Sequence, residues 1–329
     1  MQKPISQHVS IFTDEPEYQV SSVGETELLE KIQIWLGEAN PAYPEGIGDD
    51  CAVLKWDGGS CRLLTTVDGV GYGIHFDDSV PPEGVGHKLI ARNLSDIASM
   101  GGRPLQAVIS LWMDGITDVR WLERFYRGIR ESALKLGVKL VGGDVSKATK
   151  GTWIADLTLM GVTEKPCLRK GVLLGDTLWI TGSLGGSILK KHWQFEPRLQ
   201  EGQWLAEYGG VHAMMDISDG LAKDLPTLVG AHQVELFGLP ISSDAKQCSE
   251  KSGKTPTEHA WSDGEDYELL FALDSEIEAE SFIEDWSREF ELPLTCIGRV
   301  VDEKEQFKVV DQTGEVWKAG RGYEHFREA

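Results

Sequence analysis

The sequence has few of the features that build disulfide scaffolds or zinc sites. Its 329 residues include five cysteines, an odd number, and none of them forms a CxxC pair. These counts argue against a disulfide framework and against a structural zinc site. Cys51 follows two acids, which would raise the pKa of its thiol, so we expect a small buried residue rather than a nucleophile.

Long apolar segments are also missing. No apolar run reaches about 18 residues, the length that crosses a membrane. Residues 1–17 lack the apolar core of a secretory signal. We therefore expect a cytoplasmic protein with no membrane partner.

Positive charge is scarce as well. The chain carries 32 Lys and Arg against 53 Asp and Glu, a formal net charge of −21. This balance argues against nucleic acid as a partner, because nucleic-acid binding needs a basic surface. An acidic protein can still bind anionic phosphates where metal ions lie between the charges, so the positions of the acids matter more than their total.

What the chain does contain is an ordinary globular composition, with 41% hydrophobic and 26% charged residues. Apolar periodicity predicts helices over residues 24–36, 84–100, 119–136 (ending at Gly137), 220–229 and 277–290. It predicts strands over residues 62–67, 106–113, 138–141, 152–162, 176–181, 267–273 and 295–301. Strict βαβ alternation is absent, so we predict an α+β fold with two mixed α/β domains rather than one doubly wound sheet. The expected divisions are an N-terminal arm and helix over 1–45, a first domain over 46–165 and a second over 166–329.

The most informative pattern is a set of acids at the ends of apolar segments, beside glycine or serine. It recurs in five segments: GIGDD (46–50), TTVD (65–68), NLSD (93–96), GGD (142–144) and DISDG (216–220). Magnesium prefers oxygen ligands, and glycine lets backbone N–H groups approach phosphate. Each segment alone can be turn or helix-cap chemistry, as at Asp219-Gly220. Asp96 is the strongest candidate, because a carboxylate among apolar neighbours in a helix is unfavourable unless it is paired or bound to metal.

Common nucleotide-binding motifs do not explain these acids. Ser252-Gly253-Lys254-Thr255 is similar to the end of a Walker A loop, but Cys248 stands where the motif needs glycine, and Pro256 would interrupt the helix that should follow. No GxGxxG, protein-kinase, GxSxG or HExxH motif is present. If ATP binds, it binds through another scaffold.

Seven sequence blocks together resemble the thiamine-monophosphate kinase family, in a group that includes aminoimidazole ribonucleotide synthetase, selenophosphate synthetase and a hydrogenase-maturation ATPase. The blocks are GIGDDCAVL (46–54), NLSDIASMGGRP (93–104), GGD (142–144), GD-x-x-WITG (175–182), DISDGLAKDL (216–225), DGEDYELLF (263–271) and GYEHF (322–326). The resemblance implies ATP-dependent phosphorylation of thiamine monophosphate to thiamine diphosphate, by direct transfer assisted by several Mg²⁺ ions. It also implies aminoimidazole-ribonucleotide-synthetase-like domains in a homodimer, with the N-terminal domains pairing into a β-barrel.

The resemblance further implies the residues of the site. The metal ligands would be Asp50, Thr66, Val67, Asp68, Asp96, Asp144, Asp216 and Asp219. The ATP contacts would be Gly143, Asp144, Arg169 and Ser218. The contacts with thiamine monophosphate would be His75, Glu265 and Tyr323. The chemistry of these side chains agrees, since a tyrosine ring suits a cationic thiazolium and an arginine offers a fixed fork for phosphate.

Several positions depart from the family pattern. Val67 stands where threonine is usual, so only its backbone carbonyl can serve a metal. Val145 and Lys147 replace the usual threonine and arginine after GGD. These departures leave two alternatives open: a related ATP-dependent synthetase, or a homologue that binds Mg-ATP but has no turnover.

Overall fold

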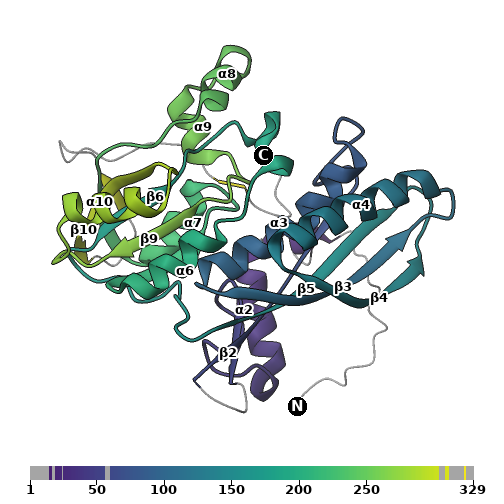
Figure 1. The fold of residues 1–329 in the computed structure, drawn as a ribbon, viewed down its shortest axis with the longest axis horizontal. Coiled ribbons are helices and arrows are strands. Elements are labelled where there is room, and N and C mark those ends of the chain that lie inside the picture. Colours follow the sequence, from purple (N-terminus) through teal and green to yellow (C-terminus); the bar gives the residue numbers. More distant parts are fainter. Residues whose placement is uncertain are drawn as a thin grey trace.

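The computed structural model describes residues 15–16, 19–23, 25–55, 60–303, 308–310 and 322–323. The chain forms two mixed α/β domains, each built on one sheet, and they lie side by side (Figure 1). The short helix α1 (Val20–Val23), the helix α2 (Glu25–Leu36) and the 3₁₀ turn η2 (Gly37–Ala39) precede the first sheet. Most of the predicted N-terminal arm falls outside the described residues. No described helix has the length and apolar content of a membrane span.

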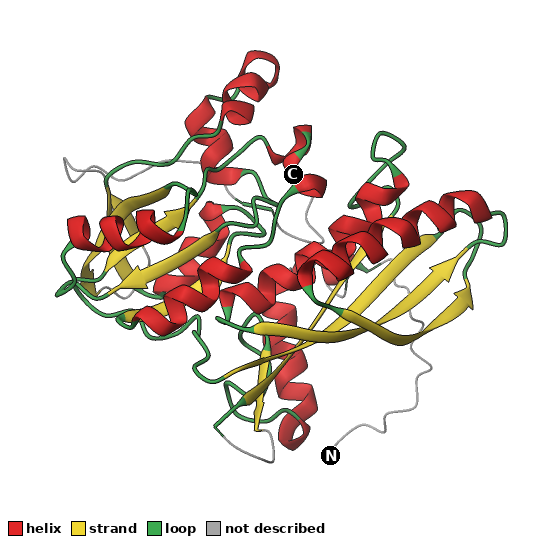
Figure 2. Ribbon diagram, in the orientation of Figure 1, coloured by secondary structure: helices red, strands yellow, loops and turns green. Residues whose placement is uncertain are grey.

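The first sheet has the strand order β1-β2-β5-β3-β4 and is antiparallel except for the pair β3–β4. Its strands are β1 (Ala52–Lys55), β2 (Arg62–Gly71), β3 (Arg103–Met113), β4 (Lys139–Lys147) and β5 (Trp153–Thr163). The helices α3 (Pro82–Ser99) and α4 (Val119–Leu136) both cover one face of this sheet (Figure 2). We call the opposite face the outer face. Side chains of β5 alternate between buried and more exposed, as the period-two pattern of a half-covered sheet requires.

The second sheet has the strand order β11-β8-β10-β6-β9-β7. Its strands are β6 (Thr177–Thr181), β7 (Val211–Asp216), β8 (His232–Leu236), β9 (Leu269–Leu273), β10 (Leu294–Glu303) and β11 (Lys308–Val310). The helical elements of this half are η3 (Ser187–Leu189), α5 (Lys191–Gln194), α6 (Leu199–Tyr208), α7 (Leu221–Val229), α8 (Ser243–Ser252), α9 (Pro256–Ser262) and α10 (Ala279–Glu289). All residues of β9 are buried, which explains its continuous apolar sequence.

Helix boundaries follow local chemistry where the sequence supplies it. The predicted end of α4 at Gly137 is confirmed: this residue has a left-handed φ of 76° and closes the helix through its backbone N–H. Asp118 caps the other end by accepting a hydrogen bond from the backbone N–H of Arg120.

Two expectations about local structure were wrong. The predicted strand over 138–141 extends to Lys147, because its parallel ladder with β3 continues through the glycines of GGD. Pro256 does not interrupt a helix: it occupies the first turn of α9, where proline is tolerated, and Thr255 forms a capping box with Glu258. The Ser252–Thr255 segment is therefore a turn between two helices, which supports its rejection as a phosphate loop.

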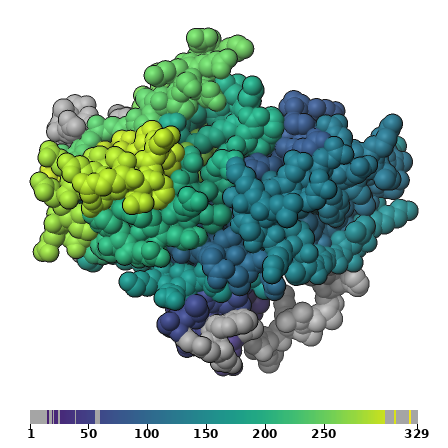
Figure 3. Space-filling model, in the orientation of Figure 1, coloured from purple at the N-terminus to yellow at the C-terminus, as the bar shows by residue number. Residues whose placement is uncertain are grey.

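The two halves pack directly against each other (Figure 3). Helix α3 of the first half contacts α5, α6 and β7 of the second. The close approach needs Gly202 on α6, since an added Cβ there would lie 2.0 Å from the carbonyl oxygen of Ala98. Helix α3 is thus the element through which the first domain meets the second.

Candidate active site

The residues at the centre of the site lie on one face of α3. This polar face consists of Lys88, Arg92, Ser95, Asp96 and Ser99, whose spacing of three and four places them on one side of a helix. It carries positive charge in the middle of α3 and an acid and hydroxyls near its end. Each of the five side chains makes a hydrogen bond or an ion pair with a residue outside α3.

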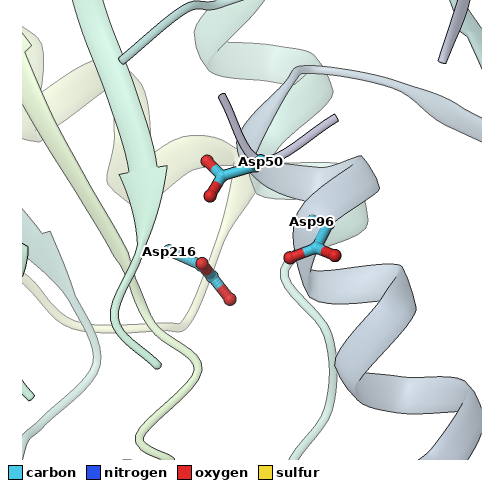
Figure 4. A group of neighbouring side chains, drawn as sticks. All are labelled: Asp50, Asp96 and Asp216. Carbon is cyan, nitrogen blue, oxygen red and sulfur yellow. The ribbon is translucent and has the colours of Figure 1, made fainter. Parts of the chain in front are cut away.

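Three carboxylates meet at the acidic end of this face. We call Asp50, Asp96 and Asp216 the acidic triad, because one oxygen from each lies within 4.8 Å of the others (Figure 4). They come from the segment before β1, from α3 and from the end of β7. Burial first, and then the neighbouring acids, raise the pKa of Asp96 well above its ordinary value. Burial and the charge of Asp50 likewise raise the pKa of Asp216 to about 7. The triad therefore needs a proton or a cation to offset its charge.

Each member of the triad is also held by a hydroxyl group. The donors and acceptors are Thr66 to Asp96 (2.5 Å), Ser95 to Asp216 (2.6 Å) and Ser99 to Asp50 (2.8 Å). Hydrogen bonds of this kind fix the carboxylates before any ligand binds. Thr66 points to the helix side of the sheet, so its neighbour Val67 points to the outer face and is 61% exposed.

Arg169 provides the positive charge nearest the triad. Its Nε donates to Asp50 at 2.9 Å, a second guanidinium nitrogen bonds to the same oxygen, and its backbone N–H donates to Asp49 at 3.1 Å. Burial and the charge of Asp50 raise the pKa of Asp49 to about 6. Asp49 also accepts a hydrogen bond from the hydroxyl of Tyr43 at 2.5 Å. The guanidinium thus lies against the acids from the side of the second domain.

Asp68 pairs with Arg92 beside the triad. The Nε of Arg92 donates to Asp68 at 2.8 Å, and the guanidinium also bonds to the carbonyl of Gly69. Burial raises the pKa of Asp68, Arg92 opposes this, and the charges of Asp219 and Glu265 add to it. Asp68 therefore feels acids from the second domain as well as its own.

The second domain contributes a compact group of residues opposite this pair. Glu265 donates its backbone N–H to the carbonyl of Ser218 at 2.7 Å, and Tyr323 donates its own to Asp219 at 2.9 Å. Glu265 and Tyr267 have left-handed φ values of 63° and 50°, a conformation that is strained for residues other than glycine. Three segments distant in sequence thus converge beside Asp68.

His75 lies in the turn after β2 and faces the same region. Its Nδ1 accepts the backbone N–H of Gly71 at 3.0 Å, which leaves the proton of a neutral ring on Nε2. Its carbonyl accepts a hydrogen bond from Lys88 at 2.7 Å, and Lys88 also pairs with Glu265 at 2.6 Å. Two of the three predicted substrate contacts therefore share one ammonium group.

Gly143 and Asp144 lie apart from the triad. They belong to β4, an edge strand, and among the described residues no hydrogen bond or ion pair joins Asp144 to the triad. The register opposite Ser110 puts Asp144 on the outer face. An added Cβ at Gly143 would lie 2.0 Å from the carbonyl oxygen of Ile109, so the strand pairing itself requires glycine there. Both residues line a cavity of about 800 Å³ between α4 and β4.

Sequence reasoning missed the basic half of the polar face and the three supporting side chains, namely Lys88, Arg92, Ser95, Ser99 and Asp49. One signal was available: Lys88, Arg92, Ser95 and Ser99 share a helical face with Asp96, counted in threes and fours from it. The expectation for Cys51 is confirmed, because it is buried and its pKa is raised by burial and by the surrounding acids.

Comparison with known proteins identifies the class first. Residues 48–163 match the family model of the AIR synthase related protein, N-terminal domain. A solved structure of hydrogenase maturation protein HypE in complex with ATP shares the fold, with a TM-score of 0.64 over 87% of this chain and 90% of that one, at 19% identity. The predicted class of mixed α/β domains is thereby confirmed, whereas neither comparison bears on a dimeric barrel.

More similar relatives define the family within that class. The thiamine-monophosphate kinase of Rhodopirellula baltica is 40% identical over 79% of this chain and 84% of that protein. The thiamine-monophosphate kinase of Aquifex aeolicus is 36% identical over 68% and 79%. A solved structure of AaThiL complexed with AMPPCP and TMP has a TM-score of 0.79 over 93% of this chain and 98% of that one, at 31% identity. The chain belongs to the thiamine-monophosphate kinase family, as the sequence blocks predicted.

Proposed function

We propose that this protein transfers the γ-phosphoryl group of ATP to thiamine monophosphate, giving thiamine diphosphate and ADP. The observation that carries the proposal is the acidic triad, three carboxylates that converge from both domains in a chain of this family. A triad of this charge suits a reaction between two polyanions, since cations held there offset the repulsion between them. The relative named as complexed with AMPPCP and TMP supports the same pair of substrates.

The donor set of the site fits Mg²⁺. The triad offers only carboxylate oxygens, and Thr66, Asp68 and Asp219 add further oxygens nearby. Oxygen-only sites suit hard cations, whereas zinc would favour histidine or thiolate. Cys51 lies beside Asp96, but its raised pKa keeps it protonated and so a poor ligand. When bound, Mg²⁺ would offset the charge of the phosphates and of the carboxylates that hold it.

The chain itself acts by positioning. The attacking group is a phosphate oxygen of thiamine monophosphate, already an anion, so its attack on the γ-phosphorus needs no general base. The new P–O bond forms as the bond between the γ-phosphorus and its bridging oxygen breaks, and ADP leaves with that electron pair. Arg169 would contact the nucleotide phosphates and the triad would hold the cations that offset their charge, and such alignment supplies a large part of the rate in phosphoryl transfer. Ser218, two positions after Asp216 in the chain, would join them.

The acceptor would lie on the substrate side, between His75, Glu265 and Tyr323. Tyr323 is 49% exposed and its backbone N–H is bonded to Asp219, and its ring would stack on the thiazolium. Glu265 brings a carboxylate to the same place, which suits the positive charge and amino group of the thiamine rings. His75 would present its Nε2 proton to the acceptor.

Homodimer formation through the outer face is the arrangement we favour. Val67, Trp112 and Ile154 expose apolar surface on this face, and β4 is an edge strand of the sheet that the described residues form. Asp144 lies on the same face. A second copy packed on this face would connect Gly143 and Asp144 with the triad. A nucleotide bound in the 800 Å³ cavity could make the same connection if it extended around the edge of β4. The barrel of the family resemblance is one form of such packing.

The two alternatives remain testable. HypE, at 19% identity, shares the fold alone and gives no support for a synthetase activity. A homologue without turnover would still bind Mg-ATP. Val145 and Lys147, which follow GGD, motivate this second hypothesis. No nucleic-acid or membrane partner is proposed, and the cytoplasm remains our expected location.

The decisive experiment incubates the purified chain with Mg-ATP and thiamine monophosphate and follows thiamine diphosphate by chromatography. Product that requires Mg²⁺ and is lost in Asp96→Asn supports the kinase. Nucleotide binding without product would favour the homologue that lacks turnover, and product with aminoimidazole ribonucleotide precursors instead would favour the synthetase.

A further inference from the structure

We propose that Lys88 is a positioning residue for the acceptor: its buried ammonium holds the His75 turn and Glu265 together, and so sets the affinity for thiamine monophosphate but not for ATP. The proposal rests on the function proposed above. Lys88 does not contact the acidic triad. Arg92 lies between them on α3, one helical turn nearer to the triad than Lys88 is. Its effect should therefore be confined to the substrate side.

The ammonium of Lys88 is completely satisfied by three partners. It donates to the carbonyl of His75 at 2.7 Å, to Oε1 of Glu265 at 2.6 Å and to Nδ1 of His192 at 3.0 Å. An ammonium has three protons and no acceptor, so three acceptors use all of them. The side chain is 0% exposed, which removes water as a competing partner. The result is a tripod of fixed geometry.

The hydrogen bond from Lys88 to His192 fixes the tautomer of the His192 ring. Lysine cannot accept a hydrogen bond, so Nδ1 of His192 must carry its lone pair toward Lys88. Burial and the charge of Lys88 lower the pKa of His192 to about 4, and the ring is therefore neutral near pH 7. His192 thus acts as a neutral acceptor, and Glu265 provides the single carboxylate that pairs with the ammonium.

These partners come from three separate parts of the chain. His75 follows β2 in the first domain, His192 lies on α5, and Glu265 lies in the segment before β9. Lys88 therefore joins both domains at the point where the predicted acceptor contacts face each other. Glu265 also has a left-handed φ of 63°, a conformation that surrounding contacts must maintain. The ion pair with Lys88 is one of those contacts.

A role in stability alone does not explain a lysine here. Burying an ammonium is unfavourable, and replacing a buried ion pair as a whole with apolar side chains of similar volume is often neutral or stabilising. Burial lowers the pKa of Lys88, and the charge of Glu265 opposes this. A fully buried cation that joins His75 to Glu265, two residues predicted to contact thiamine monophosphate, is instead what the positioning of a charged substrate requires.

The experiment measures thiamine monophosphate binding by calorimetry, and the KM of each substrate, for Lys88→Met. We expect the Kd and KM for thiamine monophosphate to rise by about tenfold or more, as the loss of charge-assisted hydrogen bonds predicts. The KM for ATP should stay within about twofold, since the three partners of the Lys88 ammonium include neither Arg169 nor a member of the acidic triad. Lys135→Met is the matched control, because it breaks an exposed cross-domain ion pair with Glu196 at 2.5 Å by the same substitution and should leave both constants unchanged.

A double-mutant cycle with Glu265→Gln tests whether Lys88 acts through its partner. We expect the combined loss of thiamine monophosphate affinity to be smaller than the product of the single losses. The proposal would be overturned if the loss of affinity in the double variant equalled the product of the two single losses. Equal rises in the KM values for thiamine monophosphate and ATP, or an unchanged Kd for thiamine monophosphate in Lys88→Met, would overturn it too. If Lys88→Met does not fold, Lys88→Gln, whose amide keeps two donors, takes its place in the same cycle.

The outcomes separate this inference from the proposed function. Wild-type protein that binds thiamine monophosphate without converting it refutes the kinase but still allows the Lys88 comparison by calorimetry. Wild-type protein that converts it, with Lys88→Met unaltered in Kd and KM, refutes the inference alone.

Discussion

The hydroxyl of Ser95 donates a hydrogen bond of 2.6 Å to Oδ2 of Asp216, across the boundary between the two domains. Both residues are buried, and they are 121 positions apart in the chain. Ser95 sits on α3, which is packed into the core of the first domain, so it holds a carboxylate of the second domain at a set position. The geometry of the triad therefore depends on how the two domains are joined.

Replacing Ser95 with alanine should weaken metal binding without abolishing it. The hydroxyl lowers the pKa of Asp216, so its loss leaves that carboxylate more readily protonated and less well aligned. We expect the Mg²⁺ concentration for half-maximal activity to rise about three- to tenfold, and the free energy of unfolding to fall by about 1 kcal/mol. Magnesium titration of the kinase assay and urea unfolding measure the two effects. Ser249→Ala, which removes an exposed helical hydroxyl, should change neither; an unaltered Mg²⁺ requirement in Ser95→Ala would contradict the prediction.

Sequence alone predicted the acids of the site and left out most of what supports them. Asp96 was identifiable because a carboxylate among apolar helical residues is unusual. Lys88 and Arg92 share the helical face of Asp96, but that spacing alone does not show that they are buried, since a lysine or arginine on a helix is ordinarily solvent-exposed and their burial depends on partners outside α3. The extent of β4 was missed for a related reason, because only its pairing with β3 carries a strand through the two glycines.

Asp216→Asn separates catalysis from stability. In the kinase assay we expect a loss in kcat of about a hundredfold or more, because the amide is a poor ligand for Mg²⁺ and one charge of the triad is gone. Without metal, the same change should not destabilise the fold near pH 8, since it relieves repulsion among three neighbouring acids, of which Asp50 and Asp216 are buried. Thermal unfolding and the rate assay on the same preparation measure both. Asp285→Asn, which removes a charge paired with Arg288 on α10, is the control and should retain full activity. Retained activity in Asp216→Asn would remove this residue from the site.

The pH dependence of stability should reveal the triad directly. Asp216 has a pKa of about 7 in the folded chain, mainly through burial, against about 4 for an unfolded aspartate. The folded state therefore binds the proton more tightly, so the free energy of unfolding without metal should fall as the pH rises from about 4 to about 7. Mg²⁺ requires the ionised form, and its stabilising effect should be larger near pH 8 than near pH 5.

Melting temperatures with and without saturating Mg²⁺, taken across that range, provide the measurement. Asp216→Asn should flatten the metal-free slope and reduce the pH dependence of the Mg²⁺ effect. The prediction is contradicted if the metal-free stability rises over the same pH interval or if the Mg²⁺ effect does not depend on pH. Either result would show that folding does not raise the pKa of the triad.

Charges placed on the outer face should convert the proposed dimer into a monomer. Trp112 is 47% exposed on β3 and lies beside Ile154 in the strand register. In a symmetric dimer built on this face, Trp112→Glu would bring buried like charges together in both copies, which disfavours association. Light scattering during size exclusion should then report the single-chain mass of 36.4 kDa instead of twice that value. Ile283→Glu, which puts the same charge on α10 at a similar exposure of 40%, should leave the dimer intact. If wild-type protein is already monomeric at assay concentrations and fully active, Asp144 has to reach the triad within one chain, or it has no part in the reaction.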